Sequence, residues 1–204
     1  MAVTTDKSVF YHIPKTGGVF VKEAMRASGL KYGRCRNKKV NHYLKREHSC
    51  PSTTMQEDIE NKFSFCFVRK PVDWYVSFWC FRIMSQTVDL RFPADRCWDM
   101  VFERFVVNIL ERYPNGFVTQ LYKEYVGELA DQIDFIGKQE NLREDLIKAL
   151  TTAGEDFDPQ VIRNVRKRNV AAGQHKYGSR AVMSKRTREW LLDTERWIIK
   201  TFYD

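Results

Sequence analysis

The sequence predicts an α/β protein in which helices cover both faces of a central parallel β-sheet. Three short apolar runs, at residues 8–13, 63–68 and 132–137, have the length and composition of inner strands. Helical patterns separate them, and strands that alternate with helices favour a parallel sheet. The chain of 204 residues is long enough for one core and shows no domain boundary. We therefore predict a single domain that spans residues 1–204.

The first apolar run ends at Pro14 and leads into Lys-Thr-Gly-Gly at residues 15–18. Residues 18–28 then carry apolar side chains at helical spacing, and Gly29 marks the expected end of that helix. A strand, a glycine turn and a helix in this order form an anion site, because backbone N–H groups and the helix dipole converge on one point. Lys15 adds a full positive charge there. An ordinary tight turn is the alternative.

The second apolar run leads into Arg69 and Lys70, and Pro71 is well placed as the first residue of a helix. We expect Arg69 at the carboxyl end of a central strand, where open α/β sheets bind ligands. Ser77 lies about two turns into the helix, and its side chain tilts back toward the helix start. A guanidinium and a hydroxyl suit a second phosphate. A capping arginine and a solvent-facing serine fit the pattern equally well.

The other segments complete the predicted fold. Residues 31–39 are strongly basic and read as a loop or an edge strand, and residues 47–62 as a surface loop with one helical turn. A dense apolar stripe predicts one helix over residues 94–113, and another helix follows at residues 139–150. Ser184 is the expected N-cap of a closing helix.

Composition indicates the kind of partner and compartment. The formal net charge of +8 favours an anionic partner, such as a nucleotide or an acidic sugar, although excess basic residues also aid solubility. Five cysteines without zinc-site spacing favour a reducing compartment. No secretory leader and no long apolar stretch are visible, so we expect a soluble, cytoplasmic protein.

Two segments resemble the cofactor motifs of a known enzyme family. Residues 12–18 (His-Ile-Pro-Lys-Thr-Gly-Gly) and residues 67–77 (Phe-Val-Arg-Lys-Pro through Ser77) are similar to the two motifs of sulfotransferases that use 3′-phosphoadenosine 5′-phosphosulfate (PAPS). The closer likeness is to the carbohydrate or Golgi-type branch, which also occurs in bacteria. Residues 134–142 and the tail from residue 169 continue it more loosely. The resemblance implies the nucleotide-kinase-like P-loop fold of sulfotransferases.

The resemblance also implies an activity and a set of site residues. The activity is transfer of a sulfuryl group from PAPS to a hydroxyl of a carbohydrate or small-molecule acceptor by in-line displacement. The product is 3′-phosphoadenosine 5′-phosphate (PAP), and the reaction requires no metal. The implied cofactor-binding residues are Lys15, Thr16, Gly17, Gly18 and Val19 for the 5′-phosphosulfate, Arg69 and Ser77 for the 3′-phosphate, and Lys176 and Tyr177 over the nucleotide.

Two departures from the family pattern stand out. The family usually has hydroxyl residues where this chain has Val19 and Phe20, so side-chain bonds to phosphate would be missing. The family also usually has arginine or another polar residue where this chain has Trp74 and Tyr75.

The chemistry requires a group that stabilises the leaving oxygen and a base for the acceptor hydroxyl. Lys15 suits the first role. His42 suits the second, because histidine titrates near neutral pH and several family members carry a catalytic or substrate-facing histidine in this interval. His12 and Glu140 stay as alternatives, and a half-exposed loop histidine is the plain reading of His42.

Two other functions compete with this interpretation. A nucleotide or small-molecule kinase would need a hydroxyl residue after the loop lysine, which Thr16 provides, and an acidic residue at a strand end, for which we find no good match. A polyanion-binding module would interleave basic residues with exposed aromatic residues. We expect an acceptor that is a small molecule or a glycan, received by the basic residues 31–39 if it is anionic. We expect neither nucleic acid nor a membrane as partner, and the sequence leaves the oligomeric state open.

Overall fold

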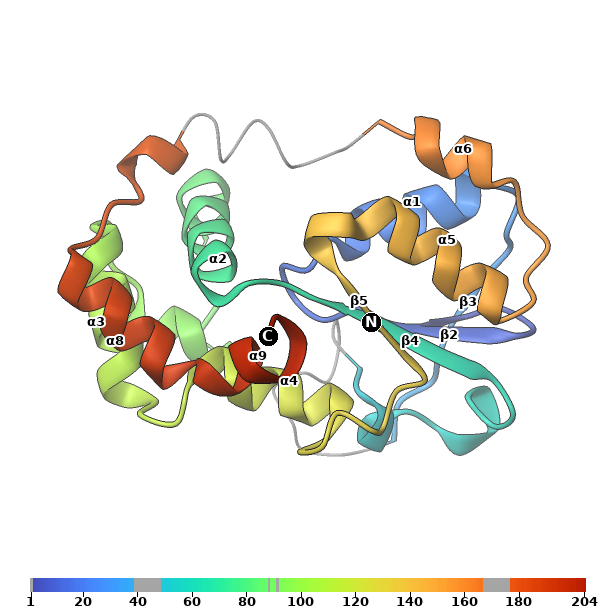
Figure 1. Ribbon diagram of the computed structural model, residues 1–204, viewed down its shortest axis with the longest axis horizontal. Helices are drawn as coiled ribbons and strands as arrows, with labels where there is room; N and C mark the ends of the chain where they lie inside the picture. Colours follow the sequence, from blue (N-terminus) through green and yellow to red (C-terminus); the bar gives the residue numbers. More distant parts are fainter. Residues whose placement is uncertain (1, 39–48, 88, 91, 167–176) are drawn as a thin grey trace. The chain divides into compact units, whose positions relative to one another are not determined.

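The protein is described by a computed structural model that covers residues 2–38, 49–87, 89–90, 92–166 and 177–204 (Figure 1). The chain divides into two compact units. Residues 1–69 and 123–168 form what we call the sheet unit, and residues 70–122 and 169–204 form the helical unit. The two are described separately below, and the single domain over residues 1–204 stays a prediction.

The sheet unit contains a five-stranded sheet in the order β3-β1-β2-β4-β5. The strands are β1 (Ala2–Thr4), β2 (Ser8–Tyr11), β3 (Gly33–Arg34), β4 (Phe63–Val68) and β5 (Phe135–Lys138). The three predicted strands β2, β4 and β5 pair in parallel, as expected, with Phe10 opposite Phe65 and Phe65 opposite Phe135. The sheet as a whole is mixed, because β1 pairs antiparallel with both β2 and β3.

Phenylalanine rings form the core on one face of this sheet. Phe10 and Phe65 stack at 5.3 Å between ring centroids, and Phe67 lies edge-on to both. Helices α1 (Gly18–Ala27), α5 (Leu142–Thr152) and α6 (Pro159–Asn164) lie on one side of the sheet (Figure 1), and residues from all three belong to the same core cluster as the rings. On the other face, Tyr11 and Cys66 are also fully buried. Burial on both faces explains why these strands read as continuous apolar runs.

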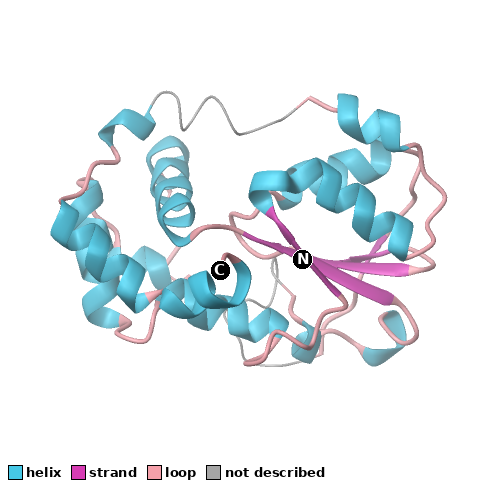
Figure 2. Cartoon of the chain, in the orientation of Figure 1, coloured by secondary structure: helices cyan, strands magenta, loops and turns pink. Residues whose placement is uncertain are grey.

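The described part of the helical unit consists of helices and their connecting loops (Figure 2), and its aromatic side chains pack against one another. Its elements are α2 (Pro71–Ser85), the 3₁₀ turn η3 (Pro93–Cys97), α3 (Phe102–Arg112), the start of α4 (Phe117–Val126), η5 (Gly178–Arg180), α8 (Lys185–Thr194) and α9 (Arg196–Phe202). Trp74 stacks on Phe78 at 5.2 Å, and Phe78 stacks on Phe105 at 5.8 Å. Among the described residues, no helix is both long and apolar enough to cross a bilayer.

The prediction of a single helix over residues 94–113 is wrong, because the helical structure is interrupted between η3 and α3. The Asp99 carboxylate accepts a hydrogen bond from the backbone N–H of Val101 at 2.6 Å, and the Asp99 carbonyl accepts one from the Trp79 indole at 3.0 Å. Such side-chain bonds to local backbone compete with the helical ladder. Val101, which the helical stripe placed in the core, is 46% exposed.

The closing helix begins where predicted and is interrupted once. Ser184 is the N-cap of α8, and its hydroxyl accepts the backbone N–H of Thr187 at 3.2 Å. The helix is then interrupted at Glu195, between α8 and α9. For residues 31–39, which we expected to form a loop or an edge strand, the structure shows a two-residue edge strand, β3.

Glu195 is the buried polar centre of the helical unit. Its carboxylate accepts hydrogen bonds from the backbone N–H groups of Val118 at 3.0 Å and Thr119 at 2.7 Å, which open α4. It also accepts the Tyr75 hydroxyl at 2.8 Å and the Thr119 hydroxyl at 2.7 Å. Burial raises the pKa of this carboxyl above its usual range, although all four bonds oppose that shift. The close approach requires glycine at position 116, where a Cβ atom would lie 2.6 Å from the carboxylate.

Glu195→Ala should therefore destabilise the helical unit strongly. The change leaves two backbone N–H groups and two hydroxyls buried without this acceptor, and we expect a loss of about 3 kcal/mol or more in the free energy of unfolding. Urea unfolding followed by tryptophan fluorescence measures it. Asp193→Ala, which removes only an exposed ion pair with Arg196, is the control and should change stability by less than about 0.5 kcal/mol. Similar losses in the two variants would contradict the structural role of Glu195.

Candidate functional site

Three parallel strands of the sheet unit end at the same edge of the sheet. The chain after β2 forms the turn at residues 12–17, β4 is followed by Arg69, and β5 is followed by the 3₁₀ turn η4 (Gln139–Asn141) and α5. The register of the parallel pairs places these carboxyl ends side by side. This is the edge at which open α/β sheets bind ligands.

The turn at this edge has an unusual backbone. Lys15 and Gly17 both have left-handed conformations, with φ of 66° and 94°. A left-handed backbone conformation is uncommon for lysine, and it persists only where the surrounding structure holds it in place. The Thr16 side chain is one such support, because it is fully buried and its hydroxyl donates to the carbonyl of Ile13 at 2.9 Å.

Helix α1 begins directly after the turn. Its first backbone hydrogen bond runs from the N–H of Val21 to the carbonyl of Gly17 at 3.2 Å. The N–H groups of Gly18, Val19 and Phe20 precede that bond, so the helix itself offers them no acceptor. The first turn contains no acidic residue. The start of α1 is thus arranged to receive an anion.

Close packing requires glycine in this turn. A Cβ atom on Gly18 would lie 1.9–2.4 Å from ring atoms of His12, and one on Gly17 would lie 2.6 Å from a methyl group of Leu142. His12 thus packs directly against the helix start. This contact favours a structural role for His12 over the role of base.

Arg69 ties the end of β4 to the turn. Its side chain is buried, with 9% of the residue exposed, and its guanidinium donates to the carbonyl of Lys15 at 3.3 Å. A cationic side chain therefore contacts the turn that precedes α1. Because the start of a helix is its positive end, a cation held here favours a negatively charged ligand.

Asp145 of α5 forms hydrogen bonds at the end of the third strand, β5. One carboxylate oxygen accepts the backbone N–H of Lys138 at 2.6 Å, and the other accepts the Asn141 side chain at 2.7 Å. Glu140, an alternative for the base, is exposed on η4. The glutamate-asparagine pair in this segment thus lies at a helix start, where such residues commonly serve as caps.

The structure brings only part of the predicted site together. Lys15, Thr16, Gly17, Gly18, Val19 and Arg69 all lie in the sheet unit. Ser77 is half-buried on α2, and Tyr177 is half-buried at the start of η5 with the Arg180 guanidinium 5.9 Å from its ring centroid; both lie in the helical unit. His42 and Lys176 lie outside the described residues.

The two departures from the family pattern coincide with packing roles. Val19 is 48% exposed at the start of α1, whereas Phe20 is buried in the core of the sheet unit. Trp74 and Tyr75 are fully buried in the helical unit, and Tyr75 binds Glu195. Three of the four unexpected residues are therefore core residues.

One charged residue near the turn was missed in the sequence. The guanidinium of Arg143 lies 5.5 Å from the centroid of the Phe20 ring. The signal available was a basic residue directly after the Glu-Asn-Leu segment, but nothing in the sequence pairs it with α1.

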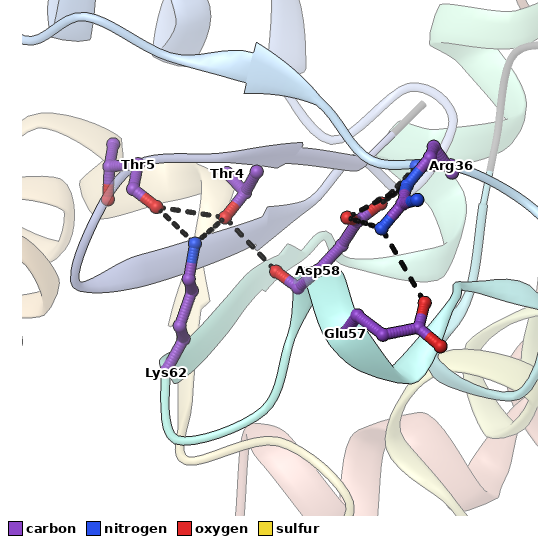
Figure 3. Close-up of polar contacts among 6 residues, drawn as sticks. All are labelled: Thr4, Thr5, Arg36, Glu57, Asp58 and Lys62. Carbon is purple, nitrogen blue, oxygen red and sulfur yellow. Dashed lines mark hydrogen bonds and ion pairs between the residues drawn. The ribbon is translucent and has the colours of Figure 1, made fainter.

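A polar network anchors the segment that precedes β4 (Figure 3). Asp58, at the end of η2 (Gln56–Asp58), accepts the backbone N–H of Arg36 at 2.5 Å and binds its guanidinium at 2.8 Å. Lys62 donates to the Thr4 hydroxyl at 2.8 Å and to the Thr5 carbonyl at 2.6 Å. The hydrogen bonds from Arg36 hold the pKa of the Asp58 carboxyl below its usual value.

Backbone pairing continues from this network. The N–H of Lys38 donates to the carbonyl of Thr53 at 2.8 Å, and that of Met55 donates to the carbonyl of Arg36 at 2.9 Å. Residues 36–38 and 53–55 are therefore hydrogen-bonded to each other.

Comparison with known proteins identifies the family of this chain. The model of the sulfotransferase family matches residues 1–203, so this chain belongs to the sulfotransferase family. The family resemblance and the α/β fold with helices around a central sheet are thus confirmed, and the family's activity is transfer of a sulfuryl group. No curated protein and no solved structure matches the chain.

Gly18→Ala should destabilise the sheet unit through the contact with His12. Either the ring or the helix start must move, and overpacking of this kind costs about 1–3 kcal/mol. Gly33→Ala is the matched control, because a Cβ atom there meets no atom within 4 Å. Urea unfolding of the two variants measures the difference. Equal stability would show that the close approach at Gly18 is not a constraint.

The bond between Asp58 and Arg36 should make stability depend on acid pH. Because the folded pKa of Asp58 is lowered, its contribution is present above the ordinary value of 3.8 and is lost as the pH falls through the folded value. Asp58→Asn should therefore be less stable than the wild type by a constant amount above about pH 5, and the difference should shrink below about pH 4. Urea midpoints between pH 3 and pH 7, taken in about half-unit steps, measure this. A difference independent of pH would contradict the role of the ionised carboxylate.

Proposed function

We propose that the protein transfers a sulfuryl group from PAPS to a hydroxyl group of a carbohydrate or small-molecule acceptor by in-line displacement. The observation that carries the proposal is the start of α1 at the carboxyl edge of the sheet, where Arg69 binds the turn at Lys15 and the first N–H groups have no acceptor within the helix. Membership of the sulfotransferase family supports the reaction class.

The residues at this edge fit a phosphosulfate donor. Gly17 and Gly18 carry no side chain, so the backbone of the turn can approach bound oxygens closely. The first turn of α1 has no carboxylate that would repel an anion. The carbonyl of Lys15 accepts a hydrogen bond from Arg69, so its partial negative charge at this edge is partly compensated.

In this proposal each residue has a defined task. The donor supplies the activated sulfuryl group. Lys15 and the backbone of residues 16–19 hold the 5′ end, and Lys15 neutralises negative charge on the oxygen that leaves with the bisphosphate. Arg69 and Ser77 bind the 3′-phosphate, while Lys176 and Tyr177 contact the nucleotide.

The acceptor requires a base and a surface. His42 is our choice for the base that removes the hydroxyl proton, and the packing of His12 on Gly18 argues against a catalytic role for His12. Lys31, Arg34 and Lys38 are exposed near β3 and favour an anionic acceptor. Arg36 of the same basic run is bound to Asp58 and Glu57, so it adds little to that attraction.

The kinase alternative finds less support in the geometry. A magnesium-dependent kinase would use the hydroxyl after the loop lysine as a metal ligand. Here the Thr16 hydroxyl is buried and donates to Ile13. Strand β4 is followed by Arg69, and strand β5 ends at Lys138. The kinase would need a carboxylate at such a strand end.

Isothermal titration calorimetry with PAP and with ATP plus magnesium tests the donor class. We expect PAP to bind with a dissociation constant at least tenfold lower than that of ATP, a difference of about 1.4 kcal/mol in binding free energy. Lys15→Ala should abolish sulfate transfer while its urea midpoint stays near that of the wild type. Lys31→Ala, which removes an exposed lysine away from the turn, is the control and should bind PAP normally. Preference for ATP, or full transfer activity in Lys15→Ala, would overturn the proposal.

A further inference from the structure

Arg143 connects three helices beside the candidate donor site. It lies in the first turn of α5, next to Leu142, which packs against Gly17 of the turn. Its guanidinium lies over the ring of Phe20 in the first turn of α1, and it donates to the carbonyl of Val165 at 2.6 Å. The residue thus joins the starts of α1 and α5 to the end of α6.

The course of α6 explains how these ends meet. The N–H of Asp158, the N-cap of α6, donates to the carbonyl of Ser28 at the end of α1. Val165 is the C-cap of α6 and is bonded to Arg143 beside the start of α1. Helix α6 therefore runs back along α1 in the opposite direction (Figure 1).

The charge of Arg143 has no anionic partner in the described part of the chain. Glu144 beside it pairs with Arg163, and Asp145 is bound to the N–H of Lys138. The Nε atom of Arg143 is buried and has no acceptor among the described residues. A half-buried cation near the positive end of a helix is unfavourable by itself. An anion bound at the start of α1 would compensate it.

We propose that Arg143, held on the ring of Phe20, strengthens binding of the anionic donor at the start of α1. In this role the pair replaces the polar groups that the sequence lacks at positions 19 and 20. Arg143 is a positioning residue: its charge and its two contacts act on the first turn of α1, and it takes no part in the reacting bonds. This inference rests on the proposed function, because PAP is the ligand that tests it.

The contacts determine which part of the side chain matters. Stacking on an aromatic face holds a guanidinium in place while leaving its charge effective. The bond to Val165 fixes the other side of the same group. A lysine could keep the charge and lie over Phe20, whereas a methionine would keep the length and lose the charge.

Titration calorimetry of PAP with Arg143→Met, Arg143→Lys and Arg163→Met tests the proposal. We expect Arg143→Met to raise the dissociation constant about tenfold, and Arg143→Lys to restore it to within about threefold of the wild type. The dependence of affinity on salt should be weaker in Arg143→Met. Arg163→Met removes a nearby exposed arginine that pairs with Glu144, and it should bind PAP as the wild type does. Wild-type affinity in Arg143→Met, or equal losses in the methionine and lysine variants, would overturn the inference.

A double-mutant cycle with Phe20→Leu tests the stack itself. Phe20→Leu keeps an apolar side chain and removes the aromatic face, so it should weaken PAP binding in the wild type and have little further effect in Arg143→Met. Additive effects would contradict a shared role. If the wild type itself fails to bind PAP, the proposed function falls as well. If it binds and the variants bind equally, only the inference about Arg143 fails.

Discussion

The bond from Arg69 to the carbonyl of Lys15 joins the ends of two adjacent parallel strands, and the arrangement of the candidate site depends on it. The register of β2 against β4 sets where each strand ends, so the distance between the two residues follows from the sheet. The left-handed conformation of Lys15 is intrinsically unfavourable by about 1–2 kcal/mol. The fold sustains it because Arg69, Thr16 and the strand pairing together determine the path of the turn.

The same turn concentrates positive charge before any ligand arrives. The Arg69 guanidinium binds the turn that precedes α1, and the Arg143 guanidinium lies over the ring of Phe20 in its first turn. Charges that are already oriented need no reorganisation when the anion binds, which is the condition for strong electrostatic stabilisation. Part of the excess positive charge of the chain is therefore concentrated near this turn. It is not spread evenly, since Arg36 and Arg163 are paired with carboxylates on the surface.

Segments whose structure follows from local pattern could be predicted from the sequence. Strand β4 and the start of α2 at Pro71 have the predicted bounds, and so does the turn at residues 15–18. The helix over residues 94–113 failed because its break depends on the Asp99 side chain and on the distant Trp79. Arg143 could not be found for the same reason: its partners lie more than one hundred residues away at Phe20 and twenty-two residues on at Val165.

Aromatic residues at motif positions have a similar physical role in each of the two units. In the sequence, Phe20 and Tyr75 read as the loss of polar ligands. In the structure each is buried and contacts a charged residue from a later segment, Arg143 for Phe20 and Glu195 for Tyr75. A buried ring beside a charge excludes water and fixes the charged group, so its electrostatic effect on its surroundings is less screened. A change from a polar to an aromatic residue at such a position can therefore move a polar role to another residue while the local charge is retained.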